Sequence, residues 1–198
     1  MTDADLPDMP ELNFSYRPSV LGAAWNFRLT PEAITWDTGR RGGRVPYDQV
    51  TRVRMSFRPA TLQSQRFLTE IWSRDGTKLR IASTSWKSMV VLERLDDGYR
   101  GFIGELHRRL TAAASRADFV RGTNPPLYWI GLAVFVASAL AIAGLVARSA
   151  QAGARGAALL VGFFLIAFLW QAGNYFRRNR PGRYRANAPP PDMLPAQP

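Results

Sequence analysis

The sequence predicts an α+β protein: an antiparallel β-sandwich or barrel of about seven strands, capped by an amphipathic helix and followed by two transmembrane helices. Three observations lead to this prediction. Short runs of alternating apolar residues fill residues 13–86, which is typical of antiparallel strands. Residues 97–113 change to a helical period. Two uncharged apolar segments then occupy most of the C-terminal half.

The strand region is divided by turn signals. We expect strands at 13–17, 24–30, 33–38, 43–47, 50–58, 66–74 and 77–84. Asp75-Gly76, between the last two, is a strong signal for a tight hairpin, and Pro31-Glu32 and Gly42-Gly43 mark earlier turns. Residues 87–96 fit neither pattern and are left unassigned. The acidic residues 1–12 are predicted to be disordered.

The helical segment has one apolar face. Its members follow the spacing i, i+3, i+4, i+7 and i+11: Tyr99, Phe102, Ile103, Leu106 and Leu110. Its opposite face takes the charged residues Arg100, Glu105, Arg108 and Arg109. Such a helix must cover either the open end of the sheet or a membrane surface, and we favour the sheet because short strands alone leave a core uncovered. His107, the only histidine, lies on the rim, where we expect a solvated or half-buried side chain.

The two apolar segments are predicted to be transmembrane helices at residues 126–148 and 156–176. A helix of about 21 residues is roughly 31 Å long, which matches the hydrocarbon core of a bilayer. A hairpin buried in a larger soluble core is the alternative. We disfavour it because the chain has no spare domain large enough to bury both helices.

The arginines predict the orientation of this hairpin. Residues 149–155 are predicted to form a short periplasmic or external loop. The loop has few arginines compared with the flanks of the hairpin, so the positive-inside rule places both termini in the cytoplasm. Five arginines after the second span are candidate contacts for anionic lipid: Arg177, Arg178, Arg180, Arg183 and Arg185. The whole segment 177–198, basic and then proline-rich, is predicted to be disordered.

Small residues recur at intervals of four in both spans, at Ala133, Ala137 and Ala141 and at Ala158 and Gly162. Such ridges let helices approach closely in lipid. Packing within the hairpin is the favoured interpretation, and a homodimer is the alternative.

Two segments, Phe27–Trp36 (FRLTPEAITW) and Gly43–Arg54 (GRVPYDQVTRVR), resemble the opening of bacterial pleckstrin-homology-like (PH-like) domains found in small membrane proteins. The shared pattern is a strand, a turn and a second strand, followed by an apolar-Pro-Tyr-Asp step into the next strand. The resemblance covers about residues 14–113 and implies that residues 13–118 form a cytoplasmic PH-like domain. It also implies a scaffold or binding module with no known catalytic residues.

Composition excludes several kinds of chemistry. The chain has no cysteine, which excludes thiolate catalysis and cysteine-bound metals, and with one histidine any metal site would need oxygen ligands. Asp96-Asp97 is best explained as the start of a helix rather than a catalytic pair. We therefore expect no enzyme, no cofactor and no metal. The net charge of +11 gathers around the predicted membrane boundary, which favours anionic lipid over nucleic acid as the partner.

The best candidate for a binding site is the loop at residues 39–44. Its three arginines, Arg40, Arg41 and Arg44, can engage phosphate or carboxylate groups, although a solvated hairpin is the alternative. Arg52, Arg54 and Arg58 alternate along the next strand and either extend this patch or form the wet side of the sheet. The leading hypothesis is a membrane-anchored, non-enzymatic interaction module that binds a protein partner or anionic lipid headgroups. The alternative is an accessory or assembly subunit of a larger membrane complex that acts through its transmembrane helices.

Overall fold

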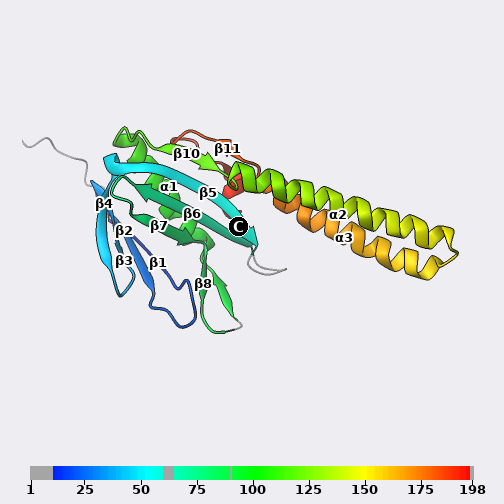
Figure 1. The fold of residues 1–198 in the computed structure, drawn as a ribbon. Helices are drawn as coiled ribbons and strands as arrows, with labels where there is room; N and C mark the ends of the chain where they lie inside the picture. The colour runs from blue at the N-terminus through cyan, green and yellow to red at the C-terminus, as the bar shows by residue number, and fades with distance from the viewer. Residues whose placement is uncertain (1–10, 60–64, 90, 197–198) are drawn as a thin grey trace, which may run out of the picture. The chain divides into compact units, whose positions relative to one another are not determined.

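The computed structural model describes residues 11–59, 65–89 and 91–196 and divides the chain into two compact units (Figure 1). The first unit comprises the described residues up to Arg121 together with those from Gly182 onward, and it is mixed α+β. The second unit, Gly122–Pro181, contains two long apolar helices. The predicted α+β class followed by two apolar helices is therefore confirmed, while residues 1–10 of the segment expected to be disordered lie outside the described residues.

The first unit contains eleven strands, one α-helix and two short 3₁₀ helices within the described residues. They are β1 (Leu12–Tyr16), β2 (Trp25–Leu29), β3 (Ala33–Asp37), β4 (Gly42–Pro46), η1 (Tyr47–Gln49), β5 (Val50–Pro59), β6 (Gln65–Ser73), β7 (Lys78–Ala82), β8 (Thr84–Trp86), β9 (Leu92–Arg94), α1 (Asp96–Ala112), β10 (Asp118–Arg121), β11 (Gly182–Arg183) and η2 (Pro191–Met193). Strands β1 to β7 coincide with the seven predicted strands, and β9 forms within the segment that the sequence left unassigned.

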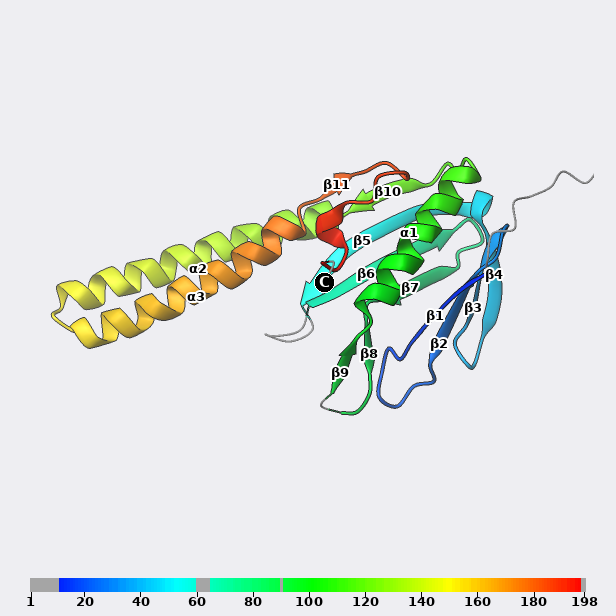
Figure 2. The same cartoon turned by 180° about the vertical axis from the view of Figure 1, so that it is seen from behind.

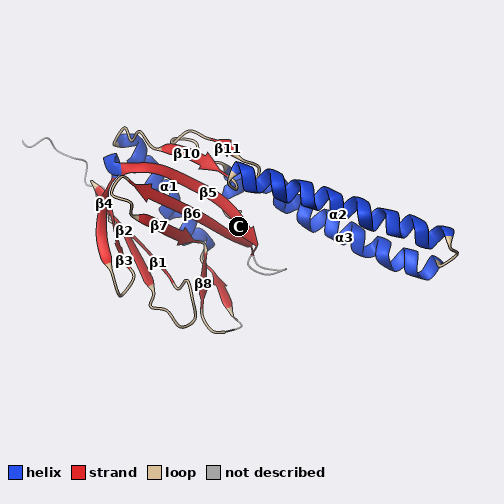
Figure 3. Cartoon of the chain, viewed as in Figure 1, coloured by secondary structure: helices blue, strands red, loops and turns tan. Residues whose placement is uncertain are grey.

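Within the described residues the strands form three separate sheets, not the closed barrel that was one predicted arrangement (Figure 3). The orders are β1-β2-β3-β4, β11-β10-β5-β6-β7 and β8-β9. The 3₁₀ turn Tyr47–Gln49 connects β4 of the first sheet to β5 of the second. Neighbouring strands are antiparallel except β10, which runs parallel to β5.

The hydrophobic core lies between the sheets and α1, which crosses the face of β5, β6 and β7 in Figure 2. All five residues of the predicted apolar face of α1 are at most 1% exposed, so the expectation that this helix covers the sheet is confirmed. The rings of Tyr99 and Phe102 lie 6.2 and 5.5 Å from the ring of Phe14 on β1.

Two polar residues of α1 correct the sequence interpretation. Arg109, expected on the outer face, and His107, expected on the rim, are each only 1% exposed. His107 is buried because the C-terminal segment packs against it through Tyr184, with ring centroids 5.7 Å apart. Arg109 follows Phe102 by seven residues, so helical periodicity places it on the buried stripe. The buried face is thus wider than its apolar members indicate.

The predicted hairpin at Asp75-Gly76 joins β6 to β7. Gly76 has a φ of +85°, a conformation that favours glycine, and its amide donates to the carbonyl of Ser73 at 3.1 Å. The Asp75 carboxylate accepts from the backbone amide of Thr77 at 2.9 Å, and this hydrogen bond holds the pKa of that carboxyl below its ordinary value. Local turn chemistry therefore fixes the register of the two strands.

The C-terminal segment is ordered from residue 182 to residue 194, which differs from the disorder predicted for 177–198. Strand β11 pairs with β10 through Val120↔Arg183 and Arg121↔Gly182, and Met193 is fully buried. Leu194 is nearly buried, and the Tyr184 amide donates to the Phe119 carbonyl at 3.1 Å. Apolar side chains between the prolines supply buried area that stabilises this segment, so the α+β unit extends beyond the predicted boundary at residue 118.

The second unit is a helical hairpin of α2 (Pro125–Gln151) and α3 (Arg155–Arg178). Both helices are long and apolar enough to cross a membrane. Large apolar side chains remain exposed along them, including Leu140 (68%), Leu159 (77%) and Phe163 (66%). Core helices of a soluble protein would bury these groups, which argues against the alternative of a soluble core. The predicted loop at 149–155 shortens to residues 152–154 because α2 continues to Gln151.

The two helices pack through aromatic rings and one of the two small-residue ridges. Phe135 of α2 lies 5.1 Å from the ring of Phe168 on α3, while Ala158 is buried and a side chain at Gly162 would meet Val146. The ridge of Ala133, Ala137 and Ala141 is exposed instead. The expected packing within the hairpin therefore holds for the ridge of α3 and not for that of α2, where the aromatic face makes the contact.

Candidate anion-binding surface

The predicted arginine loop is the turn between β3 and β4. Thr38 and Arg41 close this turn by a backbone hydrogen bond of 2.8 Å, and Arg40 and Arg41 are exposed. Arg44 lies on β4, where its guanidinium forms an ion pair with Glu32. The structure therefore keeps the three predicted arginines on one hairpin but leaves only Arg40 and Arg41 without a carboxylate among the described residues.

The five arginines predicted to contact lipid after the second span are divided between the two units. Arg177 and Arg178 end α3, and Arg180 follows in the second unit. Arg183 belongs to β11, and Arg185 forms a β-bridge with Ala188, so both are part of the first unit.

A larger group of basic side chains lies on the five-stranded sheet. Strand registers and ion pairs place them on the face opposite α1, which is turned toward the viewer in Figure 1. We call this the basic face; it comprises Arg52, Arg54, Arg58, Arg66, Glu70, Trp72, Lys78, Arg80 and Asp118. The face thus has six cations and two carboxylates, and four of the cations lie within 4.0 Å of a carboxylate. The sequence predicted the β5 members of this face, and cross-strand pairing adds the others.

At one end of the basic face the charges are matched. The Glu70 side chain is 3% exposed, and its carboxylate lies 2.7 Å from Lys78 Nζ, 3.4 Å from Arg80 Nε and 4.0 Å from Arg54 Nη1. Lys78 and Arg54 also lie over the Trp72 ring, 4.4 and 5.1 Å from its centroid. One buried carboxylate surrounded by three cations and a ring is a stable internal arrangement.

At the other end the charges are unmatched. Arg58 on β5 pairs directly with Arg66 on β6. Among the described residues no carboxylate lies within 4.0 Å of either guanidinium, and the sequence has no acidic residue between Asp48 and Glu70. Arg66 Nε is buried without a hydrogen-bond partner, and burial, together with the neighbouring Arg58, holds the Arg66 pKa below its ordinary value. Like charges directly opposite each other on a sheet are destabilising.

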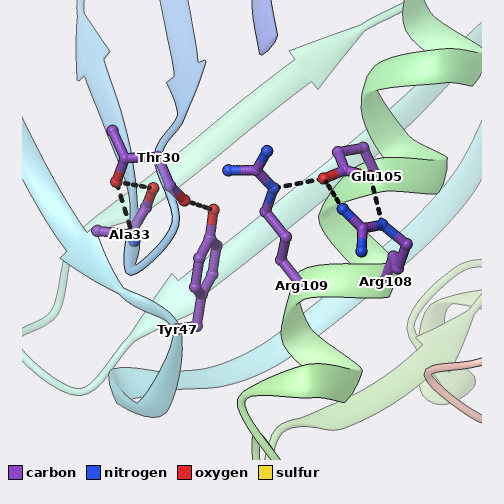
Figure 4. Close-up of polar contacts among 6 residues, drawn as sticks. All are labelled: Thr30, Ala33, Tyr47, Glu105, Arg108 and Arg109. Atoms are coloured by element: carbon purple, nitrogen blue, oxygen red, sulfur yellow. Dashed lines mark hydrogen bonds and ion pairs between the residues drawn. The ribbon is translucent and has the colours of Figure 1, made fainter. Parts of the chain in front are cut away.

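A second charged network is centred on Glu105 of α1 (Figure 4). The Glu105 carboxylate accepts from Arg109 Nε at 2.6 Å and from two nitrogens of Arg108 at 2.7 and 2.6 Å. These hydrogen bonds, first that from Arg108, hold the Glu105 pKa below its ordinary value. Beside it the Tyr47 hydroxyl donates to the Thr30 carbonyl at 2.8 Å. Because Arg109 is buried, this network joins α1 to the sheets rather than facing a ligand.

His107 links α1 to the C-terminal segment. Its Nδ1 lies 2.7 Å from the Ile103 carbonyl and its Nε2 lies 2.9 Å from the Tyr184 hydroxyl. A carbonyl can only accept, so Nδ1 carries the proton and Nε2 accepts from Tyr184. Burial lowers the pKa of His107, which favours this neutral form. Sequence reasoning missed the contact because its two members are 77 residues apart.

A shallow groove on the exposed side of the four-stranded sheet has a mixed polar lining. It is lined by Asn13, Ser15, Asn26, Arg28, Thr35 and Asp37, together with residues of the same strands. Arg28 pairs with Glu11 at 3.3 Å, so the groove presents little net charge. Among the described residues no group of three His, Cys, Asp or Glu side chains could hold a metal ion. The basic face is therefore the surface best suited to bind an anionic ligand.

No protein-family model, curated protein or solved structure matches this chain. The functional argument accordingly rests on the chemistry of its own residues.

Proposed function

We propose that this chain is a non-enzymatic interaction module that α2 and α3 anchor in a bacterial inner membrane. Its PH-like domain faces the cytoplasm, together with both termini, and binds anionic lipid headgroups. The supporting observation is that β10 and β11, which lead into and out of the helical hairpin, pair with each other through Arg121↔Gly182. The hairpin is thus an insertion between two paired strands of one domain, and both of its ends must leave that domain on the same side.

Two further observations support the PH-like assignment and the anchor. A four-stranded antiparallel sheet, a second sheet and a covering helix follow one another in the order expected from the resemblance. The large apolar side chains of α2 and α3 are exposed along both helices, as helices in lipid require.

Charge favours lipid over a protein as the partner. The basic face has six cations and two carboxylates. Each basic residue near an anionic leaflet contributes about 1 kcal/mol to binding, and a domain tethered to the bilayer meets that leaflet at a high effective concentration.

The orientation can be tested by cysteine labelling because the natural chain has no cysteine. Gln151→Cys at the end of α2 and Lys87→Cys between β8 and β9 are both exposed positions. A membrane-impermeant maleimide should label Gln151→Cys in cells with an intact inner membrane and Lys87→Cys only after that membrane is permeabilised. The reverse result, or recovery of the chain without detergent in the soluble fraction, contradicts the proposal.

Lipid preference is tested on the full chain in a neutral detergent. Native mass spectrometry should show tighter binding of phosphatidylglycerol than of phosphatidylcholine with the same acyl chains. Equal affinities contradict the lipid-binding part of the proposal. If the chain purifies in mild detergent with a stoichiometric protein partner instead, the accessory-subunit alternative is favoured.

A further inference from the structure

We infer that Arg58 and Arg66 together bind the phosphate of one anionic lipid headgroup, as a two-arginine clamp. The site lies at the end of the basic face formed by the last residues of β5 and the first residues of β6. The inference rests on the proposed function and deepens it, because it names the site and the chemical group bound there. Arg40, Arg41 and Arg44, the loop that the sequence favoured, are not part of this site.

The first argument is electrostatic. Arg58 and Arg66 are cross-strand partners, and no described carboxylate neutralises them. Four residues earlier on the same strand and the same face, Arg54 has the Glu70 carboxylate within 4.0 Å. The protein therefore matches charge at one end of the face and leaves two adjacent like charges at the other. A bound anion removes this repulsion and supplies the missing acceptors.

The second argument concerns hydrogen bonds. Arg66 Nε is buried and has no partner, and the Ser56 hydroxyl, two residues from Arg58 on the same face, is 96% buried and also unpartnered. Buried donors without a hydrogen-bond partner are rare in folded proteins, and each one lowers stability. Residues directly opposite each other on adjacent antiparallel strands have Cβ atoms about 5 Å apart, so one phosphate with several acceptor oxygens can bridge the Arg58 and Arg66 guanidinium groups.

The third argument concerns position along the sheet. Strand β10 runs parallel to β5, and its last residue, Arg121, aligns with Met55. Residues 56–59 of β5 therefore extend past the end of β10 in the direction in which both strands run. Three residues separate Arg121 from Pro125, a link that spans at most about 14 Å. Because the proposed function tethers this domain to a bilayer, a lipid headgroup is the favoured source of the phosphate.

The experiment uses the full chain in a neutral detergent, with native mass spectrometry as the measurement and phosphatidylglycerol as the probe. Arg58→Gln combined with Arg66→Gln should weaken binding of the most tightly held lipid about tenfold or more. The matched control, Arg40→Gln with Arg41→Gln, removes the same charge from another exposed hairpin and should change affinity less than twofold. Because the paired arginines repel each other, the double variant should melt no lower than the natural chain.

Each remaining outcome has a definite meaning. An equal loss in both double variants indicates general attraction between charges and overturns the clamp, as does an unchanged affinity in the Arg58 and Arg66 variant. Displacement of the lipid by millimolar inorganic phosphate shows that the site takes a free anion and overturns the assignment to a headgroup. If the natural chain shows no preference for phosphatidylglycerol, the proposed function fails as well, whereas a preference that survives loss of both arginines removes only the clamp.

Discussion

Two arginine pairs in the same domain differ in whether a carboxylate lies near them. Arg109 and Arg108 share the Glu105 carboxylate, with donor–acceptor distances of 2.6 to 2.7 Å, although Arg109 is only 1% exposed. Arg58 and Arg66 face each other on adjacent strands with no described carboxylate near them. The first pair shares a carboxylate that supports the fold, and the second has none among the described residues and lies where solvent or a ligand can reach it. The difference separates charges that build the domain from charges that are available for binding.

Removing the shared carboxylate should have the largest effect. Glu105→Ala leaves a buried guanidinium without its nearest acceptor, and breaking a buried ion pair from one side costs about 3 kcal/mol of unfolding free energy or more. Urea unfolding of the full chain in detergent, followed by tryptophan fluorescence, measures this loss. Arg108→Ala is the matched control, since this side chain is exposed and shares the same carboxylate; it should cost under about 1 kcal/mol. Equal effects would mean that burial does not distinguish the two arginines.

The matched end of the basic face should show an intermediate effect. Glu70→Gln removes the only carboxylate that Lys78, Arg80 and Arg54 share, and we expect a loss of about 2 kcal/mol in the same urea experiment. The loss is smaller than for Glu105 because Lys78 and Arg80 are partly exposed and regain water. A stability unchanged by this substitution would show that the three cations do not depend on Glu70.

The sequence was most informative where a local period determines burial. All five residues of the predicted apolar stripe of α1 are buried, and the seven predicted strands appear with small changes at their ends. The same pattern could not reveal charges that are matched across strands, because Glu70 meets its partners on β5 and β7 only after both hairpins form. The order of 182–194 escaped prediction for a similar reason: Met193 has no apolar period around it, and only the folded core shows where it packs.

In the candidate site, too, the sequence revealed a local pattern but not the pairing between strands. Alternation along β5 identified Arg52, Arg54 and Arg58 as one face, but alternation alone could not show that Arg54 meets Glu70 while Arg58 meets Arg66. The register of β5 and β6 decides that difference, and a single-residue slip would break both pairings. The arginine loop was favoured for its density of charge, and the pairing of Arg44 with Glu32 could not be read from composition.

His107 is a buried titratable group that, unlike the two arginine pairs, stays neutral. Its pKa is lowered by burial from the ordinary value of 6.5, so the unfolded chain binds a proton more readily than the folded one. The stability contributed by the neutral form is complete above pH 6.5 and is lost as pH falls from there through the folded pKa. Urea midpoints of the natural chain should decline over that range, and His107→Gln should flatten this part of the profile. A midpoint that rises on acidification would contradict the neutral assignment.

The smallest effect gives the sharpest comparison, because two arginines on one strand should respond with opposite signs. Arg54→Gln removes a partner of Glu70 and should lower the unfolding free energy by about 0.5 kcal/mol. Arg58→Gln relieves the repulsion from Arg66 and should raise it by a similar amount. Both variants remove one charge from the same face, so net charge cannot explain a difference in sign. At saturating phosphatidylglycerol, Arg58→Gln should instead have the lower unfolding free energy. In the natural chain the bound phosphate then offsets the repulsion between Arg58 and Arg66. Parallel shifts of the two variants, with or without lipid, would show that the two ends of the face are equivalent.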